Sequence, residues 1–533
     1  MTNCWLLLSE SARSENPIYI TEKARLRRAK ADPETLLIDR RDYRVSPVIL
    51  DNIRQTGARI RTVSRWLNAV SVEATGRQLQ QLARFEPIAE IDLVSTIDIT
   101  RPDVVPYPKD RVAPTRSEEL AYGFSLMQNQ FVHSTKLHQA GYTGAGILIA
   151  LLDTGFKTDL TAFDSTSIVA TWDFINNDEA VDESDCPDDP AGWQQNYHGT
   201  LVLSAIGAYW PDTLIGIAPR ADFALAKTEI SCGYTELRVE EDNWIAGAEW
   251  ADSIGADIIS SSLGYTTFDD NSGYTFEDLD GNTAFTTIAA DIAASKNIVV
   301  ITAVGNERLK DWNALVTPSD GDSVLAVGAV SSDSSLASFS SPGPSADGRI
   351  KPDITSLGVG VTTVAPDGFL TSASGTSLST PLVAGGAALA LDVDSTLTAA
   401  ALLDRIRSNG SQADSPDNDF GYGLFDAARS STLIRIDSID DIWLQVGQTM
   451  QVDIMTSGFS ASTLILSVID LPDWAYFADH SDGTGLLTLY GTTENAIASQ
   501  IWLTLQVGNY VDTISINVYT TGSMEQLVTV GPN

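Results

Sequence analysis

The longest apolar stretches of this chain border polar residues that can take part in chemistry. Residues 147–152 are apolar without interruption and end at Asp153, which Thr154 and Gly155 follow. Such a run is typical of a strand that is buried on both faces of a parallel sheet. Because ligands bind at the carboxyl edge of such a sheet, the pattern predicts that Asp153 lies where a reaction can take place.

Two runs of small apolar residues predict buried helices. Residues 201–207 follow His198, which is one of four histidines, and residues 382–391 follow Ser377. A helix N-terminus presents unpaired N–H groups and a positive dipole, which favours a negative charge that develops there. The pattern therefore predicts a site built from Asp153, His198 and Ser377, although a serine that only caps a core helix would give the same local pattern.

The first part of the chain has a different pattern of short strands and helices. Its periodicity predicts strands and helices in alternation, at residues 17–21, 47–57, 66–74, 76–83 and 88–94. This order predicts a small α+β domain with its own core. The proline-rich segment 102–114 would connect this domain to the rest of the chain.

The C-terminal part breaks into short apolar runs separated by Gly, Asp and Asn. These include residues 464–468, 485–489 and 501–505, and several short strands at such a spacing predict a β-sandwich. Its turn segments weakly resemble those of immunoglobulin-like or cadherin-like modules. The expected domains are therefore residues 1–116, residues 117–432 and residues 433–533.

The order Asp, His, Ser along the chain is that of subtilisin and differs from the orders in chymotrypsin and the α/β-hydrolases. On these residues the chain resembles the subtilases, the subtilisin-like serine peptidases. The segments that carry the resemblance are 153–155, 198–200, 258–264, 303–307 and 374–377. The resemblance implies a doubly wound α/β fold with a mostly parallel sheet, from about Gly141 to Ala428.

The resemblance also implies a role for each residue of the site. Ser377 would attack the scissile carbonyl, His198 would take its proton and later give it to the leaving amine, and Asp153 would orient the imidazole. Asn306 matches the family's oxyanion asparagine and would donate its side-chain amide to the oxyanion. The implied function is that of a serine endopeptidase whose chemistry requires no cofactor.

Two segments are expected to hold a polypeptide substrate. They resemble the family's substrate-pairing strand and the wall of its pocket, and their members are Ser262, Leu263, Gly264, Ala303 and Gly305. Binding by strand addition depends on the substrate backbone rather than on its sequence. Glu307 would favour a basic or polar substrate side chain, or is simply a solvated glutamate. Leu378 and Ser379 replace the family's usual Met and Ala, and neither change removes a catalytic group.

Two other kinds of protein share parts of this pattern. Aspartic peptidases also present a carboxylate at the end of an apolar strand in an Asp-Thr-Gly motif, but they need two such motifs and this chain has one, at Asp153. The other alternative is a catalytically silent binding protein on the same fold, with an occluded or unused triad. The intact set of catalytic residues argues against it.

The N-terminal part resembles the inhibitory prodomain of subtilases. It would act as an intramolecular inhibitor until the chain cuts itself, with the mature enzyme starting near Tyr122. The alternatives are a small domain that stays attached and a separate inhibitor. Residues 1–120 contain 19 Lys and Arg against 17 Asp and Glu, whereas residues 121–533 contain 14 against 53. This difference in charge should assist docking of the two parts.

The net charge of −37 is unusual for a chain of 533 residues. It excludes nucleic acid as a partner, because phosphates would be repelled. The composition resembles that of halophilic proteins, since salt screens self-repulsion. The acidic segments 176–189 and 278–282 are candidates for structural calcium, but their spacing matches no complete ligand set, so the metal ligands stay unknown.

Three cysteines are present, and Cys186 and Cys232 both lie in expected loops where they could form a disulfide. Cys4 would then be unpaired. No apolar run is long enough to span a membrane, and residues 4–8 are too short for a complete signal peptide. We therefore expect a secreted or cell-surface monomer whose signal peptide is not present in this chain.

Overall fold

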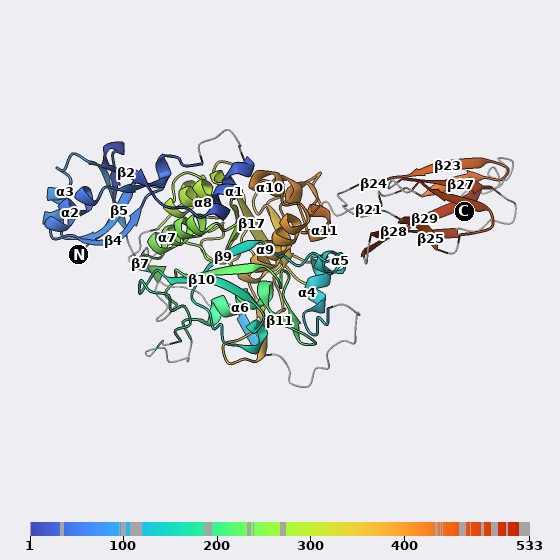
Figure 1. Cartoon of the computed structure of the whole chain (residues 1–533), viewed down its shortest axis with the longest axis horizontal. Helices are drawn as coiled ribbons and strands as arrows, with labels where there is room; N and C mark the ends of the chain where they lie inside the picture. The colour runs from blue at the N-terminus through green and yellow to red at the C-terminus, as the bar shows by residue number, and fades with distance from the viewer. Residues whose placement is uncertain are drawn as a thin grey trace. The chain divides into compact units, whose positions relative to one another are not determined.

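The computed structural model describes most of the chain, and the chain forms two compact units (Figure 1). One unit comprises residues 1–134 and 143–430, and the other comprises residues 135–142 and 431–533. The described residues are 2–31, 37–94, 96–97, 103–106, 120–184, 186, 194–231, 236–237, 239–266, 273–431, 435–436, 439, 441–457, 465–469, 471–480, 484–491, 499–507 and 510–521.

A parallel sheet of seven strands forms the centre of the first unit, in the order β10-β13-β9-β15-β16-β17-β18. The strands are β9 (Leu148–Asp153), β10 (Ser167–Asp173), β13 (Asp222–Lys227), β15 (Ile258–Ser261), β16 (Val299–Ala303), β17 (Val324–Val330) and β18 (Ile354–Leu357). Every residue of β9 is buried, as its unbroken apolar run predicts. The strand order changes direction at β9, which is where such sheets bind ligands.

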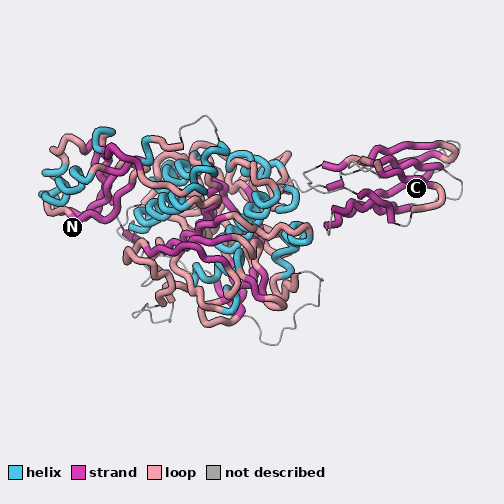
Figure 2. Tube along the Cα trace, viewed as in Figure 1, coloured by secondary structure: helices cyan, strands magenta, loops and turns pink. Residues whose placement is uncertain are grey.

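Helices cover both faces of this sheet, which confirms the predicted doubly wound α/β class (Figures 1 and 2). Helices α7 (Val239–Ile254) and α8 (Phe285–Ser295) pack together, and so do α6 (Tyr197–Gly207) and α9 (Thr376–Val393). Within the described residues, α9 alone is long and apolar enough to cross a membrane, but 94% of it is buried inside the protein.

Shorter elements complete the first unit. They are α4 (Leu126–Phe131), β11 (Tyr209–Trp210), β12 (Leu214–Ile215), β14 (Glu236–Leu237), β19 (Val361–Val364), β20 (Leu370–Ser374), α10 (Ala399–Ser408) and α11 (Ala427–Ser430). Strands β19 and β20 form a hairpin, and β20 leads through Gly375 into α9.

The N-terminal part contains an antiparallel sheet of four strands in the order β4-β5-β1-β6. Its elements are β1 (Thr2–Leu8), β4 (Arg59–Ser64), β5 (Ala69–Ala74), β6 (Ile88–Val94), α2 (Pro47–Gln55) and α3 (Gly76–Leu82). The predicted helices and the strand at 88–94 are confirmed, and the strand predicted at 66–74 begins at Ala69.

The prediction of a strand at residues 17–21 is wrong. The strand there is β2 (Arg13–Pro17), which pairs with β3 (Tyr43–Val45), and an unpredicted helix, α1 (Glu22–Ala31), follows it. The central strand β1 was also not predicted as a strand. Its two faces are both buried, because Cys4 and Leu6 join the N-terminal core while Trp5 packs among residues of the large domain. A strand buried on both faces lacks the alternation of apolar and polar residues that marks a half-buried one.

Beside one short pair of strands, the described residues of the second unit form two larger sheets, as the predicted β-sandwich requires (Figure 2). One has the order β22-β29-β28-β25 and the other β23-β27-β26, and a single hydrophobic cluster draws residues from both. The strands are β22 (Ile442–Gln445), β23 (Thr449–Ile454), β25 (Ile465–Ile469), β26 (Ala475–Asp479), β27 (Gly485–Tyr490), β28 (Ser499–Val507) and β29 (Tyr510–Thr521). Helix α5 (Ser134–Gln139) and strands β21 (Arg435–Ile436) and β24 (Thr456–Ser457) are shorter.

The cysteines agree with the expected pairing as far as they are described. Cys186 is disulfide-bonded, and Cys232, its expected partner, lies outside the described residues. Cys4 is free and buried in β1, and burial raises the pKa of its thiol to about 11. A thiol with such a pKa is unreactive at neutral pH.

Candidate active site

The three predicted catalytic residues come from three neighbouring elements. Asp153 is the last residue of β9 and is fully buried. His198 and Ser377 are each the second residue of their helix, α6 and α9, and these two helices pack against each other. His198 and Ser377 are only 9% and 5% exposed.

The carboxylate of Asp153 holds the imidazole of His198. Its Oδ1 accepts from His198 Nδ1 at 2.7 Å and from the Thr154 backbone N–H at 2.7 Å. Its Oδ2 is buried and has no hydrogen-bond partner among the residues that the structure describes. Burial lowers the pKa of His198, but the charge and hydrogen bond of Asp153 raise it more, so the net shift is upward. The geometry leaves Nε2 as the imidazole atom that can take a proton from a nucleophile.

Gly199 allows α6 to approach the end of β9 closely enough for the contact between Asp153 and His198. A Cβ atom added to Gly199 would lie 2.2 Å from the carbonyl oxygen of Gly155, so no larger residue fits there. The Gly199 N–H also donates to Thr154 Oγ1 at 3.3 Å. Residues that neighbour Asp153 and His198 in sequence therefore lock the two side chains together.

The nucleophile candidate and the oxyanion candidate meet at Gly375. A Cβ atom on Gly375 would lie 2.9 Å from Ser377 Oγ and 3.7 Å from Asn306 Nδ2, so both groups border the same small space. Asn306 Oδ1 accepts from Thr376 N at 3.0 Å and from Thr376 Oγ1 at 3.2 Å. Because its oxygen is engaged in this way, the amide Nδ2 is turned toward that space as a donor.

A proline in α9 connects the nucleophile to a substrate-binding candidate. Pro381 lies inside the helix and has no N–H to donate to the carbonyl of Ser377, four residues earlier. Ser262 Oγ donates to that carbonyl instead, at 2.9 Å. The segment 262–264 is thereby attached to the helix turn that carries Ser377.

The other substrate-binding candidates lie around a residue that sequence analysis did not identify. Cβ atoms on Gly264 and Gly305 would lie 2.1 and 2.6 Å from the methyl groups of Val316. Val316 is buried between the two predicted segments, and Leu263 and Ala303 are buried as well. In the sequence, Val316 is marked only by its place in an apolar loop, and such a place is also typical of core residues. Glu307 binds Lys310 Nζ at 2.9 Å.

A buried polar network behind Asp153 was also missed. Gln195 Nε2 donates to the carbonyl oxygens of Thr154 and Glu229, and Gln195 Oε1 accepts from Ser231 N. The carboxyl of Glu229 accepts from Tyr265 Oη at 3.0 Å. Burial, together with the nearby charge of Asp153, raises the pKa of Glu229 to about 8, so this carboxyl carries a proton at neutral pH.

In each calcium candidate, some of the described carboxylates have partners within the protein. In the stretch 176–189, Glu183 accepts from the ammonium of Lys227 at 2.7 Å, and the same ammonium binds Asp173 at 2.8 Å. In the stretch 278–282, Asp280 accepts from backbone N–H groups of the following turn. Across the described residues no group of three or more His, Cys, Asp or Glu side chains could hold a metal ion.

Ser377 and His198 lie at the starts of two helices that pack together, α9 and α6, but they are not hydrogen-bonded in this structure. Neither Ser377 Oγ nor His198 Nε2 has a hydrogen bond to a described residue. Catalytic contacts are often longer before substrate binds and shorten in the complex. The arrangement contains a buried Asp–His pair, a serine at a helix start and an amide donor beside it, which together can support acyl transfer.

Comparison with known proteins identifies the family. Residues 144–423 match the model of the Subtilase family, and residues 7–106 match that of the Peptidase S8 propeptide domain, Bacteroidota. The chain belongs to the subtilase family. Among its relatives, Subtilisin E of Bacillus subtilis is 29% identical over 380 residues, which cover 70% of this chain and 82% of the relative. Subtilisin of Bacillus pumilus is 32% identical over 314 residues, which cover 58% and 96%.

This subtilase is a subtilisin-like serine endopeptidase. Its family match covers all the segments on which the sequence resemblance rests, from Asp153 to Ser377. The propeptide match covers the last two residues of β1, helices α1, α2 and α3, and strands β4, β5 and β6 of the N-terminal part. The interpretation as a catalytically silent binding protein therefore loses its main support, and precursor processing is implied.

Proposed function

We propose that this subtilase is a secreted endopeptidase that cuts polypeptides through an acyl-enzyme formed on Ser377. The observation that carries the proposal is the 2.7 Å bond between Asp153 and His198, next to the shared space of Ser377 Oγ and Asn306 Nδ2. No cofactor takes part in this chemistry.

The reaction follows from the roles that these groups can take. Ser377 Oγ attacks the scissile carbonyl carbon while His198 Nε2 takes the hydroxyl proton, and Asp153 stabilises the imidazolium that forms. Asn306 Nδ2 and the Ser377 N–H donate to the oxyanion. His198 then gives its proton to the leaving amine as the C–N bond breaks, and water releases the acyl group by the same route.

Polypeptide binding is assigned to the segments beside Val316. Ser262, Leu263 and Gly264 would pair with the substrate backbone as an added strand, and Ala303 and Gly305 would wall the pocket for the residue before the cut. Two observations support this assignment: Ser262 is bonded to the backbone of Ser377, and Val316 lies between Gly264 and Gly305.

The precursor is proposed to contain a prodomain at residues 1–116, an enzyme domain at residues 117–432 and a β-sandwich at residues 433–533. Pairing of the connecting segment supports the inhibitory role. Strand β7 (Thr96–Ile97) pairs with β14, and β8 (Asp103–Pro106) pairs with β20, the strand that leads to Ser377. A peptide paired in this way would occupy the path that a substrate follows, and the mature enzyme would start near Tyr122.

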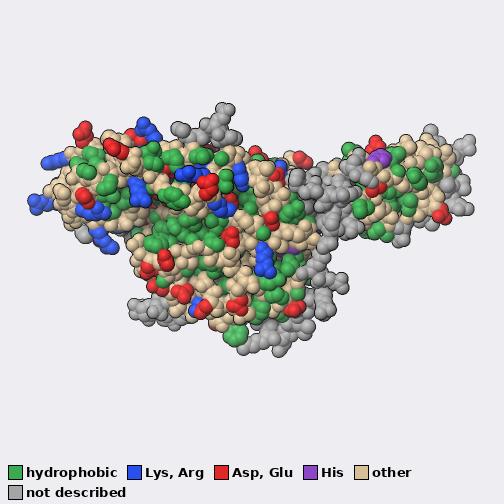
Figure 3. Space-filling model, in the orientation of Figure 1, with side chains coloured by type: hydrophobic (Ala, Val, Ile, Leu, Met, Phe, Trp, Pro, Cys, Tyr) green, Lys and Arg blue, Asp and Glu red, His purple; other side chains and the backbone are tan. Residues whose placement is uncertain are grey.

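Salt adaptation and location outside the cell belong to the same proposal. On the face drawn in Figure 3, Lys and Arg side chains cluster over the N-terminal part that carries α2 and β4. The rest of the chain, with 14 Lys and Arg against 53 Asp and Glu, accounts for all of the negative net charge. Such a surface suits a salt-rich medium, in which screening relieves self-repulsion. The enzyme is expected to act as a monomer.

The experiment that tests self-processing compares the wild type with Ser377→Ala by intact mass after expression. We expect the wild type to be shortened by the mass of an N-terminal segment and Ser377→Ala to keep its full mass. Asn313→Ala, in an exposed loop of the same domain, serves as a matched control and should be processed. Equal shortening of the wild type and Ser377→Ala would contradict self-processing, because another peptidase would then be responsible.

A further inference from the structure

The outer face of α7 is covered by the N-terminal part of the same chain. Trp5 of β1 and Trp66 join the hydrophobic cluster of α7 and α8, and the rings of Trp5 and Phe285 lie 5.8 Å apart. Beside them, carboxylates of α7 and the loop after it bind cations of the N-terminal part. The pairs are Arg61–Asp242, Arg65–Glu249, Arg27–Asp252, Arg28–Asp252, Arg65–Asp252 and Lys23–Asp257.

Asp252 is the centre of this interface. Its Oδ1 accepts from Arg27 Nη2 at 2.5 Å, and its Oδ2 accepts from Arg28 Nη2 at 2.7 Å and from Arg65 Nη2 at 3.2 Å. Asp252 is fully buried, and each of the three arginines is less than 9% exposed. Three guanidinium groups thus share one carboxylate out of contact with water, where an unpaired charge would be costly.

Arg27 uses the planar shape of its guanidinium as well as its charge. Its Nε donates to the carbonyl of Lys296 at 3.1 Å, and its Nη1 donates to the carbonyl of Ala256 at 2.6 Å. Lys296 directly follows the last residue of α8, and Ala256 lies two residues after the end of α7. The C-terminal end of a helix has carbonyl groups without intrahelical partners and the negative end of the helix dipole, so it favours a cation. An ammonium cannot reproduce this planar set of donors.

The interface also contains ion pairs in which the large domain supplies the cation and the N-terminal part supplies the anions. Lys296, in the large domain, binds Asp42 at 3.3 Å and Asp39 at 3.2 Å, both in the N-terminal part. Asp42 in turn accepts two bonds from Arg28. Burial raises the pKa of Asp42, but Arg28 and Lys296 lower it more, to about 2. Cations and anions therefore alternate across the contact, which fixes its register.

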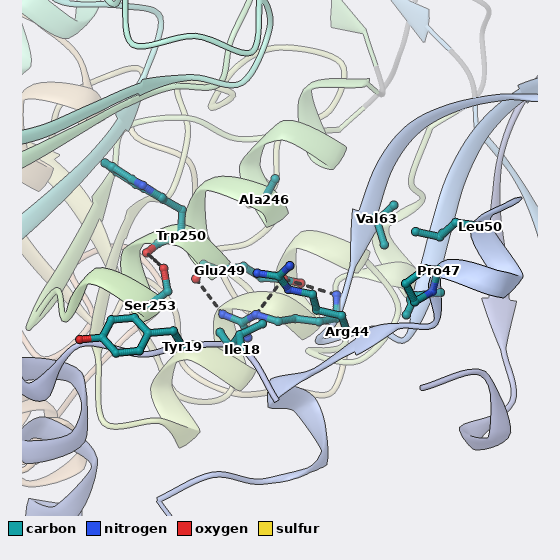
Figure 4. A pocket seen from close by; sticks show the side chains of 12 residues that line it. Ile18, Tyr19, Arg44, Pro47, Leu50, Val63, Ala246, Glu249, Trp250 and Ser253 are labelled. Carbon is teal, nitrogen blue, oxygen red and sulfur yellow. Dashed lines mark hydrogen bonds and ion pairs between the residues drawn. The ribbon is translucent and has the colours of Figure 1, made fainter. Parts of the chain in front are cut away.

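One part of the contact, beside the Arg65–Glu249 ion pair, is not closely packed. A cavity of about 490 Å³ lies between α7 and the N-terminal part, next to Glu249 and Arg65 (Figure 4). Its apolar lining comes from both parts and includes Tyr19, Leu50, Val63 and Trp250. Because apolar side chains do not fill this cavity, the neighbouring ion pairs contribute more to the recognition of the N-terminal part by α7.

We propose that α7 carries a docking surface selective for guanidinium groups, centred on Asp252, whose occupant is the arginine-bearing N-terminal segment of this chain. Selectivity comes from the position of Arg27 and Arg28 on α1 and not from positive charge alone. The proposal rests on the proposed role of residues 1–116 only in naming this segment a prodomain. It assigns the recognition of that prodomain to α1, outside the active-site cleft.

The test uses the full chain with Ser377→Ala, so that it cannot cut itself, and with a recognition site for a foreign peptidase inserted between residues 107 and 119. After the cut, the lifetime of the non-covalent complex is measured by dilution and size-exclusion chromatography. The variants are Arg27→Lys and Arg28→Lys. Lys23→Arg is the matched control, because Lys23 is 38% exposed in its side chain and its pair with Asp257 lies at the edge.

We expect Arg27→Lys to shorten the lifetime at least about tenfold, because buried acceptors lose their donors. Lys23→Arg should stay within about twofold of the parent chain. Arg27→Lys and Asp252→Asn together should cost less than the sum of the two single effects, since the residues share one contact. Unchanged lifetimes for the lysine variants would overturn the proposal, since the surface would then select charge only.

Circular dichroism before the cut identifies a variant that does not fold. If this happens with Arg27→Lys, Arg28→Lys decides, because Arg28 keeps one partner, Asp42, within its own segment. The measurement does not use peptidase activity. Failure of the proposed function would therefore leave this result intact, and a failed docking test would leave the catalytic proposal intact.

Discussion

At the scale of single residues, the buried charge of Asp153 determines what His198 can do. Asp153 Oδ1 fixes the tautomer of His198, and Oδ2 remains buried without a hydrogen bond. A carboxylate with so little other stabilisation has a strong electrostatic effect on the imidazolium that forms during proton transfer. The carboxyl of Glu229 lies close enough to Asp153 for the two groups to interact electrostatically. Because Glu229 keeps its proton at neutral pH, it adds no second negative charge next to the Asp153–His198 pair.

The first prediction concerns the pH dependence of turnover. Catalysis needs neutral His198, and Asp153 favours the protonated form, so the wild-type rate should fall as pH decreases through the raised pKa of His198. In Asp153→Asn the attraction is lost, so the acidic limb of the kcat/KM profile should move to lower pH while kcat falls about 10⁴-fold. An unmoved acidic limb would mean that another group titrates there.

The second prediction concerns the oxyanion. Asn306→Ala removes the Nδ2 donor beside Ser377 and should lower kcat about 10²- to 10³-fold with little change in KM, because the lost bond forms only in the transition state. Steady-state kinetics on a peptide substrate would measure this. Asn282→Ala, in an exposed turn, is the control. A change in KM alone would place Asn306 in ground-state binding instead.

At the scale of elements, the turn around Ser377 depends on a contact between α9 and the segment after β15. Pro381 leaves the Ser377 carbonyl without its helical partner, and Ser262 Oγ takes that place at 2.9 Å. Ser262→Ala should therefore lower the free energy of unfolding by about 1–3 kcal/mol, the cost of an unpaired buried carbonyl. Urea unfolding of chains that also carry Ser377→Ala would measure it.

The control for this prediction is Ser408→Ala, on the exposed side of α10, where the hydroxyl makes only long hydrogen bonds to residues near it in sequence, to the Arg405 carbonyl at 3.3 Å and from Asn409 Nδ2 at 3.5 Å. Its effect should stay within about 0.5 kcal/mol. If both alanine variants have the same stability, the bond to the Ser377 carbonyl contributes nothing and the account of this turn is wrong.

The elements also show how far sequence analysis reaches. Strand β9 and helices α6 and α9 were predictable because their apolar runs are long and border polar residues. Strand β1 was not, because its two faces enter different cores. Helix α1 was not predicted either, since its buried residues include Arg27 and Arg28, and charged residues normally indicate a solvated face.

The same limit applies to the site. Asp153, His198, Asn306 and Ser377 belong to recognisable segments, so the sequence alone could name them. Val316 and Gln195 act through contacts between segments distant in sequence, such as the approach of Val316 to both Gly264 and Gly305. The pattern of residues indicates the local structure of each segment, but it does not indicate which loops contact each other in the fold.

At the scale of the whole molecule, the net charge of −37 should make stability depend on salt. Self-repulsion is long-ranged at low ionic strength and is screened when the Debye length falls from about 10 Å at 0.1 M to about 3 Å at 1 M. The unfolding midpoint should therefore rise between these concentrations, equally in NaCl and KCl, as thermal unfolding of Ser377→Ala would show. Full stability in dilute buffer, with activity lost only at high salt, would contradict salt adaptation.

The central claim is that Ser377 is the nucleophile of a working triad. The most direct measurement is labelling with a fluorophosphonate, with intact mass and the labelled peptide identified by mass spectrometry, at low and high salt. We expect one adduct per mature chain, located on Ser377, and no adduct on Ser377→Ala. The absence of an adduct on the wild type under every condition, even after the N-terminal segment has been removed, would contradict it.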